Sequence, residues 1–169
     1  ILYAIAAPEI DLLGLTTVFG NVTTPKATRN ALYLLEQAGI EIPVAEGLHR
    51  PRIGPPFPPT SAVHGAEGFG TLAVPTPQRR ALVETAPEYL VRMARAHRGE
   101  LLLCPIGPLT NIAAAMELDP SFCSNLKGMV VMGGSLRAGG NITPAAEANF
   151  YNDPHAADLV LRHGCNITL

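Results

Sequence analysis

"ELLLCPIGPLTNIAAAMEL", residues 100–118, contains the three parts that decide the fold: an apolar strand, a tight turn and a helix. A Gly-Pro pair marks the turn, and the alanine-rich run after it favours a helix. The same order recurs at residues 11–39, and again between an apolar strand at residues 129–131 and a helix at residues 154–163. Repeated strand–loop–helix units predict a parallel sheet with right-handed crossovers. The sequence therefore predicts an α/β fold with a mostly parallel, Rossmann-like open sheet and helices on both faces.

The remaining segments fit this arrangement apart from one long loop. We expect a helix at residues 1–7 that Pro8 ends, a helix from Pro25 to a stop at Gly39, a short strand at residues 42–48 and an amphipathic helix at residues 82–98. Five prolines between Pro51 and Pro59 predict neither helix nor central strand for residues 49–70. A loop this long acts as a lid or binding loop, or is disordered.

Composition narrows the classes of partner. The 169 residues are enough for one domain with a substantial core. A net charge of −2 and the lack of a basic run give no electrostatic reason to expect nucleic acid or an anionic membrane. No apolar stretch is long enough to span a bilayer. The widely spaced cysteines, Cys104, Cys123 and Cys165, indicate reduced, buried thiols of a cytoplasmic protein rather than a disulfide framework or a zinc site.

The two ends of the sequence fall inside expected elements. Residues 1–7, "ILYAIAA", read as the second half of a helix that has no N-cap, and residues 163–169, "HGCNITL", stop inside an expected strand. We therefore expect residues 1–169 to form a single α/β domain that is the central part of a longer chain.

Parallel sheets bind ligands at the carboxyl ends of their strands, so the residues that follow each strand are the candidates for a site. Asn21 could bind a ligand or form an Asx-turn into the next helix. His64, among glycines at the end of the Pro-rich loop, could be solvated or approach a ligand. The carbonyl of Ile106 could ligate a hard cation such as Ca²⁺ or belong to a plain turn. Met132 could face a cleft, although methionine is more often in the core.

A polar stretch at residues 139–160, "GGNITPAAEANFYNDPHAADLV", precedes the last expected helix. Asp153 and Pro154 fit the N-cap and the first position of that helix, so capping requires only Asp153. Three further polar residues could belong to turns, or could form hydrogen-bonding groups directed at a polyhydroxylated ligand: Asn141, Glu147 and Asn149. The sequence contains no dinucleotide-binding, P-loop or nucleophile-elbow motif.

Five segments, in order across nearly the whole chain, resemble the inosine–uridine nucleoside hydrolases: "DLLGLTTVFGNVT", "HGAEGFG", "PIGPLTNIAAA", "VVMGGS" and "GNITPAAEANFYNDPHAA". The resemblance implies the nucleoside hydrolase fold and hydrolysis of the N-glycosidic bond of ribonucleosides, to free base and ribose, by a Ca²⁺-bound water. It also implies roles for single residues. Asn21, Asn141, Glu147 and Asn149 match residues that hold the ribose hydroxyls, Met132 lines the ribose site, His64 lies near the nucleobase, and the Ile106 carbonyl ligates Ca²⁺.

The chain also departs from the family pattern. The Asp-rich N-terminal motif, DxDxGxDD, and the late His-Asp pair are absent, so the resemblance supplies no catalytic residue and only an incomplete calcium site. Glu67 stands where Asp is commoner, and Ala148 where Phe is commoner. We expect a full-length form to be the active enzyme and this chain alone to be inactive. The alternatives are a fragment that binds ribosides without hydrolysing them, and one that binds a protein partner. The resemblance further implies nucleoside salvage or catabolism in the cytoplasm, and a homo-oligomer, either a tetramer or a dimer.

Overall fold

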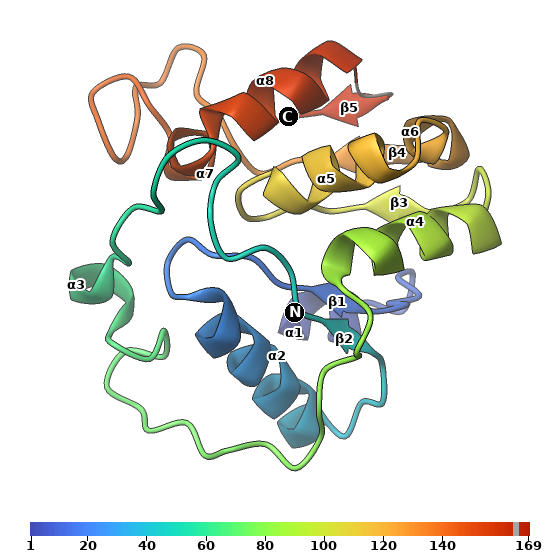
Figure 1. The fold of residues 1–169 in the computed structure, drawn as a ribbon. Helices are drawn as coiled ribbons and strands as arrows, with labels where there is room; N and C mark the ends of the chain where they lie inside the picture. Colours follow the sequence, from blue (N-terminus) through green and yellow to red (C-terminus); the bar gives the residue numbers. More distant parts are fainter. Residues whose placement is uncertain (164–165) are drawn as a thin grey trace.

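The structure, a computed structural model, describes residues 1–163 and 166–169 and contains two parallel sheets with helices packed against them (Figure 1). Strand β1 (Leu15–Thr16) pairs with β2 (Val44–Ala45). The second sheet has the order β3 (Leu102–Leu103), β4 (Gly128–Val130) and β5 (Ile167–Thr168). The helices are α1 (Leu2–Ala6), α2 (Thr24–Ala38), α3 (Ser61–His64), α4 (Ala86–Ala96), α5 (Thr110–Leu118), α6 (Phe122–Asn125), α7 (Ala148–Asn152) and α8 (Pro154–His163). The predicted α/β class is confirmed.

Helix α2 follows the signals of its sequence closely. Pro25 lies in its first turn, where a missing N–H costs nothing, and Gly39 ends it in the left-handed conformation with φ of 66°. Its buried face, which includes Leu32 and Leu35, packs against Val44 of β2. The predicted start and stop of this helix are therefore confirmed.

Strand β2 has helices on both of its faces. Successive side chains of a strand point to opposite faces. Val44 packs against α2, whereas Ala45 packs against Ala86 and Tyr89 of α4. The prediction of helices on both faces holds for this strand.

The three-stranded sheet differs, because in the described part of the chain helices pack on one of its faces only. Helix α5 packs against both α4 and α8, and these three helices cover the sheet together (Figure 1). Met129 of β4 points into this core and is 1% exposed. On the other face, Leu102 is 54% and Val130 43% exposed, since no element of residues 1–163 or 166–169 buries them. Within the described residues, helices therefore cover one face of this sheet.

Several local expectations need correction. The paired strands are shorter than expected, and α3, α6 and α7 are additional short helices. The prolines of residues 51–59 do prevent regular structure, and α3 begins only after the last of them. Cys104 was expected to be buried but is an exposed free thiol beyond β3, and Cys165 lies outside the described residues. The described residues contain no helix with the length and hydrophobicity that a membrane crossing requires.

The first turn of α5 joins the two sheets. Asn111, which is 5% exposed, donates from Nδ2 to the carbonyl of Thr17, 2.8 Å away, and its Oδ1 accepts the N–H of Leu48 at 2.9 Å. One amide side chain thereby satisfies the backbone beyond both β1 and β2. Since α5 directly follows the turn after β3, this residue holds the carboxyl ends of β1, β2 and β3 together.

The neighbouring Thr110 connects the same turn to α8. Its hydroxyl donates to Oδ2 of the fully buried Asp153 at 2.7 Å. The other oxygen of Asp153 accepts the N–H of Ala156 at 2.9 Å, which confirms Asp153 as the N-cap of α8. The carboxylate is therefore fixed by donors from two different elements.

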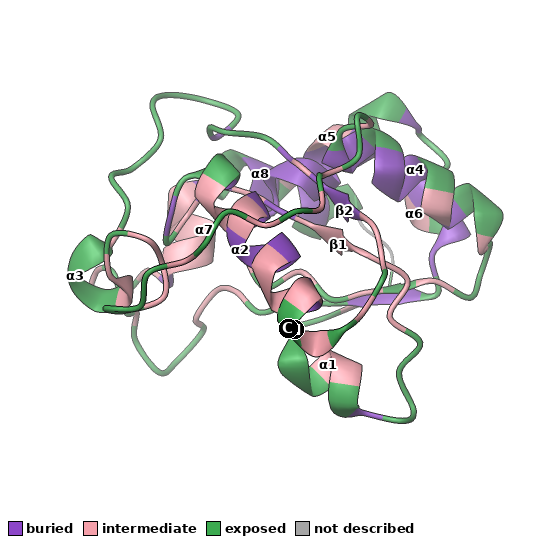
Figure 2. Cartoon of the chain, turned by 90° about the horizontal axis from the view of Figure 1, so that it is seen from below, coloured by how far each residue is buried: buried purple, intermediate pink, exposed green. Residues whose placement is uncertain are grey.

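The Pro-rich loop, residues 51–59, is attached at two points to the same part of the molecule. The N–H of Arg52 donates to Oδ2 of Asp153 at 3.0 Å, and the Arg52 guanidinium forms an ion pair with Glu117 of α5. Further along, the ring of Phe57 packs against Tyr151 of α7 with centroids 4.7 Å apart. The loop is mostly exposed elsewhere, as are the segments around α3 (Figure 2).

We expect Asn111→Ala to lower the free energy of unfolding by roughly 2–4 kcal/mol, because it leaves the Thr17 carbonyl and the Leu48 N–H without partners in a buried place. Urea unfolding followed by circular dichroism measures this loss. Gln37→Ala, an exposed change in α2, serves as the control and should change the stability by less than about 0.5 kcal/mol. Equal stability of the two variants would contradict the joining role of Asn111.

The two faces of β4 should respond differently to truncation. Met129→Ala leaves a cavity in the core and should lower the free energy of unfolding by about 2–5 kcal/mol. Val130→Ala, on the exposed face, should lower it by less than about 1 kcal/mol. The comparison uses the same unfolding measurement on both variants. Similar losses would mean that the second face is also covered in solution.

Candidate functional site

The loops after β1 and β3 lie against each other. A Cβ atom built at Gly20 would be 3.5 Å from Cδ of Pro108, and one built at Gly107 would be 2.9 Å from Cγ1 of Val18. Asn21 directly follows Gly20, and Ile106 directly precedes Gly107. The structure thus places these two predicted site residues on neighbouring loops at the carboxyl ends of their strands.

Asn149, in the first turn of α7, forms the centre of a cluster. Its Nδ2 lies 3.3 Å from the carbonyl oxygen of Ile106, 3.0 Å from that of Met132, and 3.1 Å from the Met132 sulfur. One side chain therefore connects the segment after β3 with the segment after β4. Three of the predicted site residues are in direct contact here.

Glu147, the N-cap residue of α7, is only 7% exposed. Its carboxylate accepts the N–H groups of Asn149 at 2.8 Å, Phe150 at 3.1 Å and Gly134 at 2.9 Å. The first two of these bonds cap the N-terminus of α7. The third fixes the chain just after Met132, so Glu147 holds both sides of the site.

Asn141 has a similar structural bond. Its Oδ1 accepts the N–H of Ala148 at 2.8 Å, which closes the exposed loop before α7 onto the helix. The expectation that capping in this region requires only Asp153 is therefore wrong. The short helix α7 has its own cap, and the sequence pattern did not predict this helix.

Gly134 allows α7 to pack closely on the chain after β4. It has φ of +72°, a conformation that side chains with Cβ rarely adopt, and a Cβ there would lie 2.9 Å from the ring of Phe150. A larger residue would push α7, and with it Asn149, away from the strand ends. The close packing of Phe150 thus explains why glycine occupies position 134 in "VVMGGS".

His64 and Asn21 are positioned differently from the cluster. His64 ends α3 and is half-buried, and no hydrogen bond within the described residues joins its imidazole to Asn149, Met132 or Ile106. Asn21 is exposed on its loop. The structure therefore brings five of the seven predicted residues together, with Asn21 on the adjacent loop and His64 on a separate segment.

The cluster keeps unused hydrogen-bonding capacity. The amide of Asn149 donates from nitrogen, which leaves its Oδ1 as an acceptor, and the amide of Asn141 accepts at oxygen, which leaves its Nδ2 as a donor. In the described part of the chain, no hydrogen bond involves the side chain of Asn21. These amides can bind hydroxyl groups, each of which both donates and accepts.

The same residues do not form a calcium site by themselves. Ca²⁺ takes about six to eight oxygen ligands. The Ile106 carbonyl is one such oxygen and already accepts from Asn149, while the carboxylate of Glu147 is occupied by three N–H groups. The described residues also contain no group of three or more His, Cys, Asp or Glu side chains that could hold a metal. The residues present therefore do not fit the ion.

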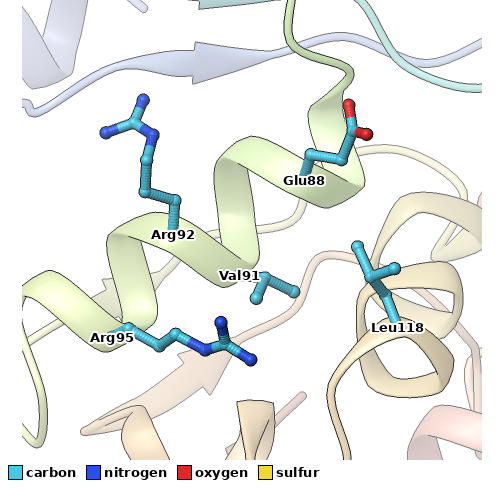
Figure 3. Close-up of a pocket in the computed structure, with 5 residues that line it drawn as sticks. All are labelled: Glu88, Val91, Arg92, Arg95 and Leu118. Carbon is cyan, nitrogen blue, oxygen red and sulfur yellow. The ribbon is translucent and has the colours of Figure 1, made fainter.

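Two shallow hollows lie outside the cluster. One, of about 360 Å³, is bordered by Gly20, Val22, His49 and Phe57 among others, and therefore opens beside Asn21. The other, of about 370 Å³, lies between α4 and the end of α5 (Figure 3). Its arginines, Arg92 and Arg95, are already paired with Glu84 and Asp119, both at 2.8 Å. The first hollow is the one near the predicted site.

The sequence alone indicates no role for Thr110 or Asn111, and only a capping role for Asp153, although all three lie in segments that carry the family resemblance. Their contacts join segments far apart in the chain, such as Thr17 with Asn111 and Thr110 with Asp153. Buried polar residues at the start of a helix were the available signal, because such groups need partners.

Comparison with known proteins supports the resemblance. The sequence model for "Inosine-uridine preferring nucleoside hydrolase" matches residues 1–169. The chain is 47% identical over 168 residues to "Probable uridine nucleosidase 1" of Oryza sativa subsp. japonica, covering 99% of this chain and 52% of that protein. Two solved structures superpose with TM-scores of 0.94. They are a plant nucleoside hydrolase, PpNRh1, at 42% identity, and the purine-preferring ribonucleoside hydrolase from Gardnerella vaginalis, at 34%.

These matches cover 98% of this chain but only 52% of the plant structure and 54% of the Gardnerella structure. The chain spans about half the length of the curated relatives it matches. Within that span, both the sequence and the arrangement of its elements agree with these proteins, and the chain belongs to the inosine-uridine preferring nucleoside hydrolase family.

Proposed function

We propose that this chain provides the ribose-binding part of a ribonucleoside hydrolase, and that a longer form cleaves the N-glycosidic bond to release the base and ribose. The observation that carries the proposal is the contact of Asn149 with Ile106 and Met132 at the ends of β3 and β4. It brings together Asn149 and Met132, which the resemblance assigns to the ribose site, and the Ile106 carbonyl, which it assigns to Ca²⁺. Asn21 lies on the neighbouring loop.

The proposed role of these residues is to orient the sugar. Ribose carries several hydroxyls, and the free amide atoms of Asn21, Asn141 and Asn149 can pair with them in a fixed direction. Glu147 holds the segments that carry these amides. Hydrogen bonds to the sugar that strengthen as the glycosidic bond breaks lower the barrier to hydrolysis.

We propose a calcium site only for a longer protein. There, further oxygens would have to join the Ile106 carbonyl, and Asn149 would have to share that carbonyl with the ion. The bound ion would supply the chemistry of activating a water molecule. This chain's own contribution is to present the carbonyl and to hold the sugar.

The identity of the base stays open in the proposal. The rice relative is named a probable uridine nucleosidase, whereas the Gardnerella structure is described as purine-preferring. We propose ribonucleosides as the substrate class, with a role in salvage or catabolism in the cytoplasm and a homo-oligomeric assembly, a tetramer or a dimer.

A second candidate function is the binding of ribosides by this chain without hydrolysis. It is favoured by the state of Glu147 and Asp153, two of the three carboxylates that are buried in the described residues. The oxygens of both already accept bonds from backbone N–H groups, and Asp153 also accepts from a hydroxyl. Neither is arranged to take a proton from a water molecule.

We expect the isolated chain to release no measurable ribose from uridine or inosine, even with Ca²⁺ present, because the described residues include no carboxylate free to act as a base beside the cluster. A reducing-sugar assay on purified chain measures this, with a plant nucleoside hydrolase as the positive control. Sustained turnover by the isolated chain would contradict the expectation.

Asn149→Ala should weaken binding of ribose by at least about tenfold, because the variant loses the acceptor that faces the sugar. NMR titration of the chain with ribose measures the affinity. Asn152→Ala is a matched control in the same helix, since its amide donates to the carbonyl of Ala148 at 2.8 Å and lies outside the cluster. Both changes should cost about 1 kcal/mol of stability, but only the first should affect binding. Equal affinities for the two variants would contradict the ribose site.

A further inference from the structure

Residues 61–70, the His64 segment, form a compact turn with His64 at the end of α3. The N–H of Gly70 donates to the carbonyl of His64 at 2.8 Å, and that of Gly68 donates to the carbonyl of Gly65 at 3.2 Å. Gly68 has φ of +80°, and a Cβ there would lie 2.8 Å from Val22 and 3.0 Å from Asn30 of α2. The segment therefore forms an internally hydrogen-bonded turn that packs against the start of α2.

Charged groups hold this segment to α2. Glu67 pairs through Oε1 with Lys26 at 2.9 Å and through Oε2 with Arg29 at 2.7 Å. Lys26 also donates to the carbonyl of Ala66 at 2.8 Å. Both the side chain and the backbone of the segment are thus bound by the helix.

Asn30 and Tyr33 extend the contact along the same face of α2. The buried amide of Asn30 donates to the carbonyl of Glu67 at 2.7 Å, and its oxygen accepts from Arg29 at 2.9 Å. Tyr33 meets Phe69 edge to face, with ring centroids 6.1 Å apart. Residues 26, 29, 30 and 33 share one face because of the helical repeat. Together, these four contacts stabilise the segment more than one isolated surface ion pair would.

The charge of Glu67 persists at neutral pH. The hydrogen bond from Lys26, and after it the one from Arg29, lower the pKa of the Glu67 carboxyl. A carboxyl with a lowered pKa keeps its ion pairs until the pH falls below the usual glutamate range. Lys26 and Arg29 are the charged groups that face it.

We propose that Lys26, Arg29, Asn30 and Glu67, the Glu67 clamp, are positioning residues that fix His64 relative to Asn21. Helix α2 begins at Thr24, three residues after Asn21, and the clamp ties the His64 segment to the same helix. Two predicted nucleoside contacts far apart in the sequence thereby share one rigid support. The inference rests on the proposed function, because it gives His64 the nucleobase and Asn21 the sugar.

Glu67→Gln tests the clamp, because it removes the charge and keeps the size of the side chain. Amide hydrogen exchange should accelerate about tenfold or more at Gly65, Gly68 and Gly70, while α5 and α8 exchange as before. Glu84→Gln is the matched control, since Glu84 forms a comparable pair with Arg92 far from the His64 segment. Arg29→Gln should reproduce the Glu67→Gln pattern from the other partner. Unchanged exchange in both variants would overturn the clamp.

Ligand binding separates positioning from simple support. In NMR titrations, Glu67→Gln should weaken binding of uridine about tenfold and leave that of ribose within about twofold, because only uridine reaches His64. Faster exchange with unchanged uridine affinity would overturn the positioning role. Equal losses for uridine and ribose would also overturn it, because they would indicate general destabilisation. Binding of neither ligand by the unmodified chain would contradict the proposed function itself and with it the role of His64.

Discussion

The arrangement of the whole site depends on one buried amide, that of Asn111. Its oxygen and nitrogen satisfy the backbone beyond β2 and β1, and its own helix follows the turn after β3. Backbone groups that leave a strand inside a protein need partners, and here a single side chain supplies two of them. The strand ends converge because they share this partner. Thr110, next to it, extends the connection to Asp153 and α8.

The buried carboxylates of this chain hold backbone rather than carry out chemistry. Glu147 fixes both the start of α7 and Gly134, in the chain beyond β4, and Asp153 fixes α8 together with the Pro-rich loop. Polar side chains that remain available are amides, which neither gain nor lose a proton near neutral pH. Such a surface can orient a hydroxylated ligand by hydrogen bonds to its hydroxyl groups. This arrangement suits the sugar-binding role that we propose for the chain.

Sequence signals predicted the elements whose ends are marked locally. Pro25 and Gly39 delimit α2, and Asp153 with Pro154 begins α8, as the structure confirms. Helix α7 was not predicted because it has only five residues. Its cap residue, Glu147, also bonds Gly134, thirteen positions away, and such a contact has no local sequence signal. The exposure of Val130 could not be predicted, since an apolar strand such as residues 128–130 gives the same pattern whether one face is covered or two. Ile106 and Met132 lie beyond neighbouring parallel strands, as the rule that parallel strand ends share an edge predicts, whereas the contact of Asn149 with both is evident only from the structure.

The prolines of residues 51–59 reduce the conformational entropy that the Pro-rich loop loses on folding. It passes from β2 to α3 with little regular hydrogen bonding, fastened mainly at Arg52 and by the Phe57–Tyr151 contact. Each proline fixes one backbone torsion before folding begins, so the unfolded loop has fewer conformations to lose. Two attachments can therefore order a segment that would need many more if it were rich in glycine. Replacing its exposed prolines by glycines would destabilise the ordered loop chiefly by giving the unfolded chain more conformations.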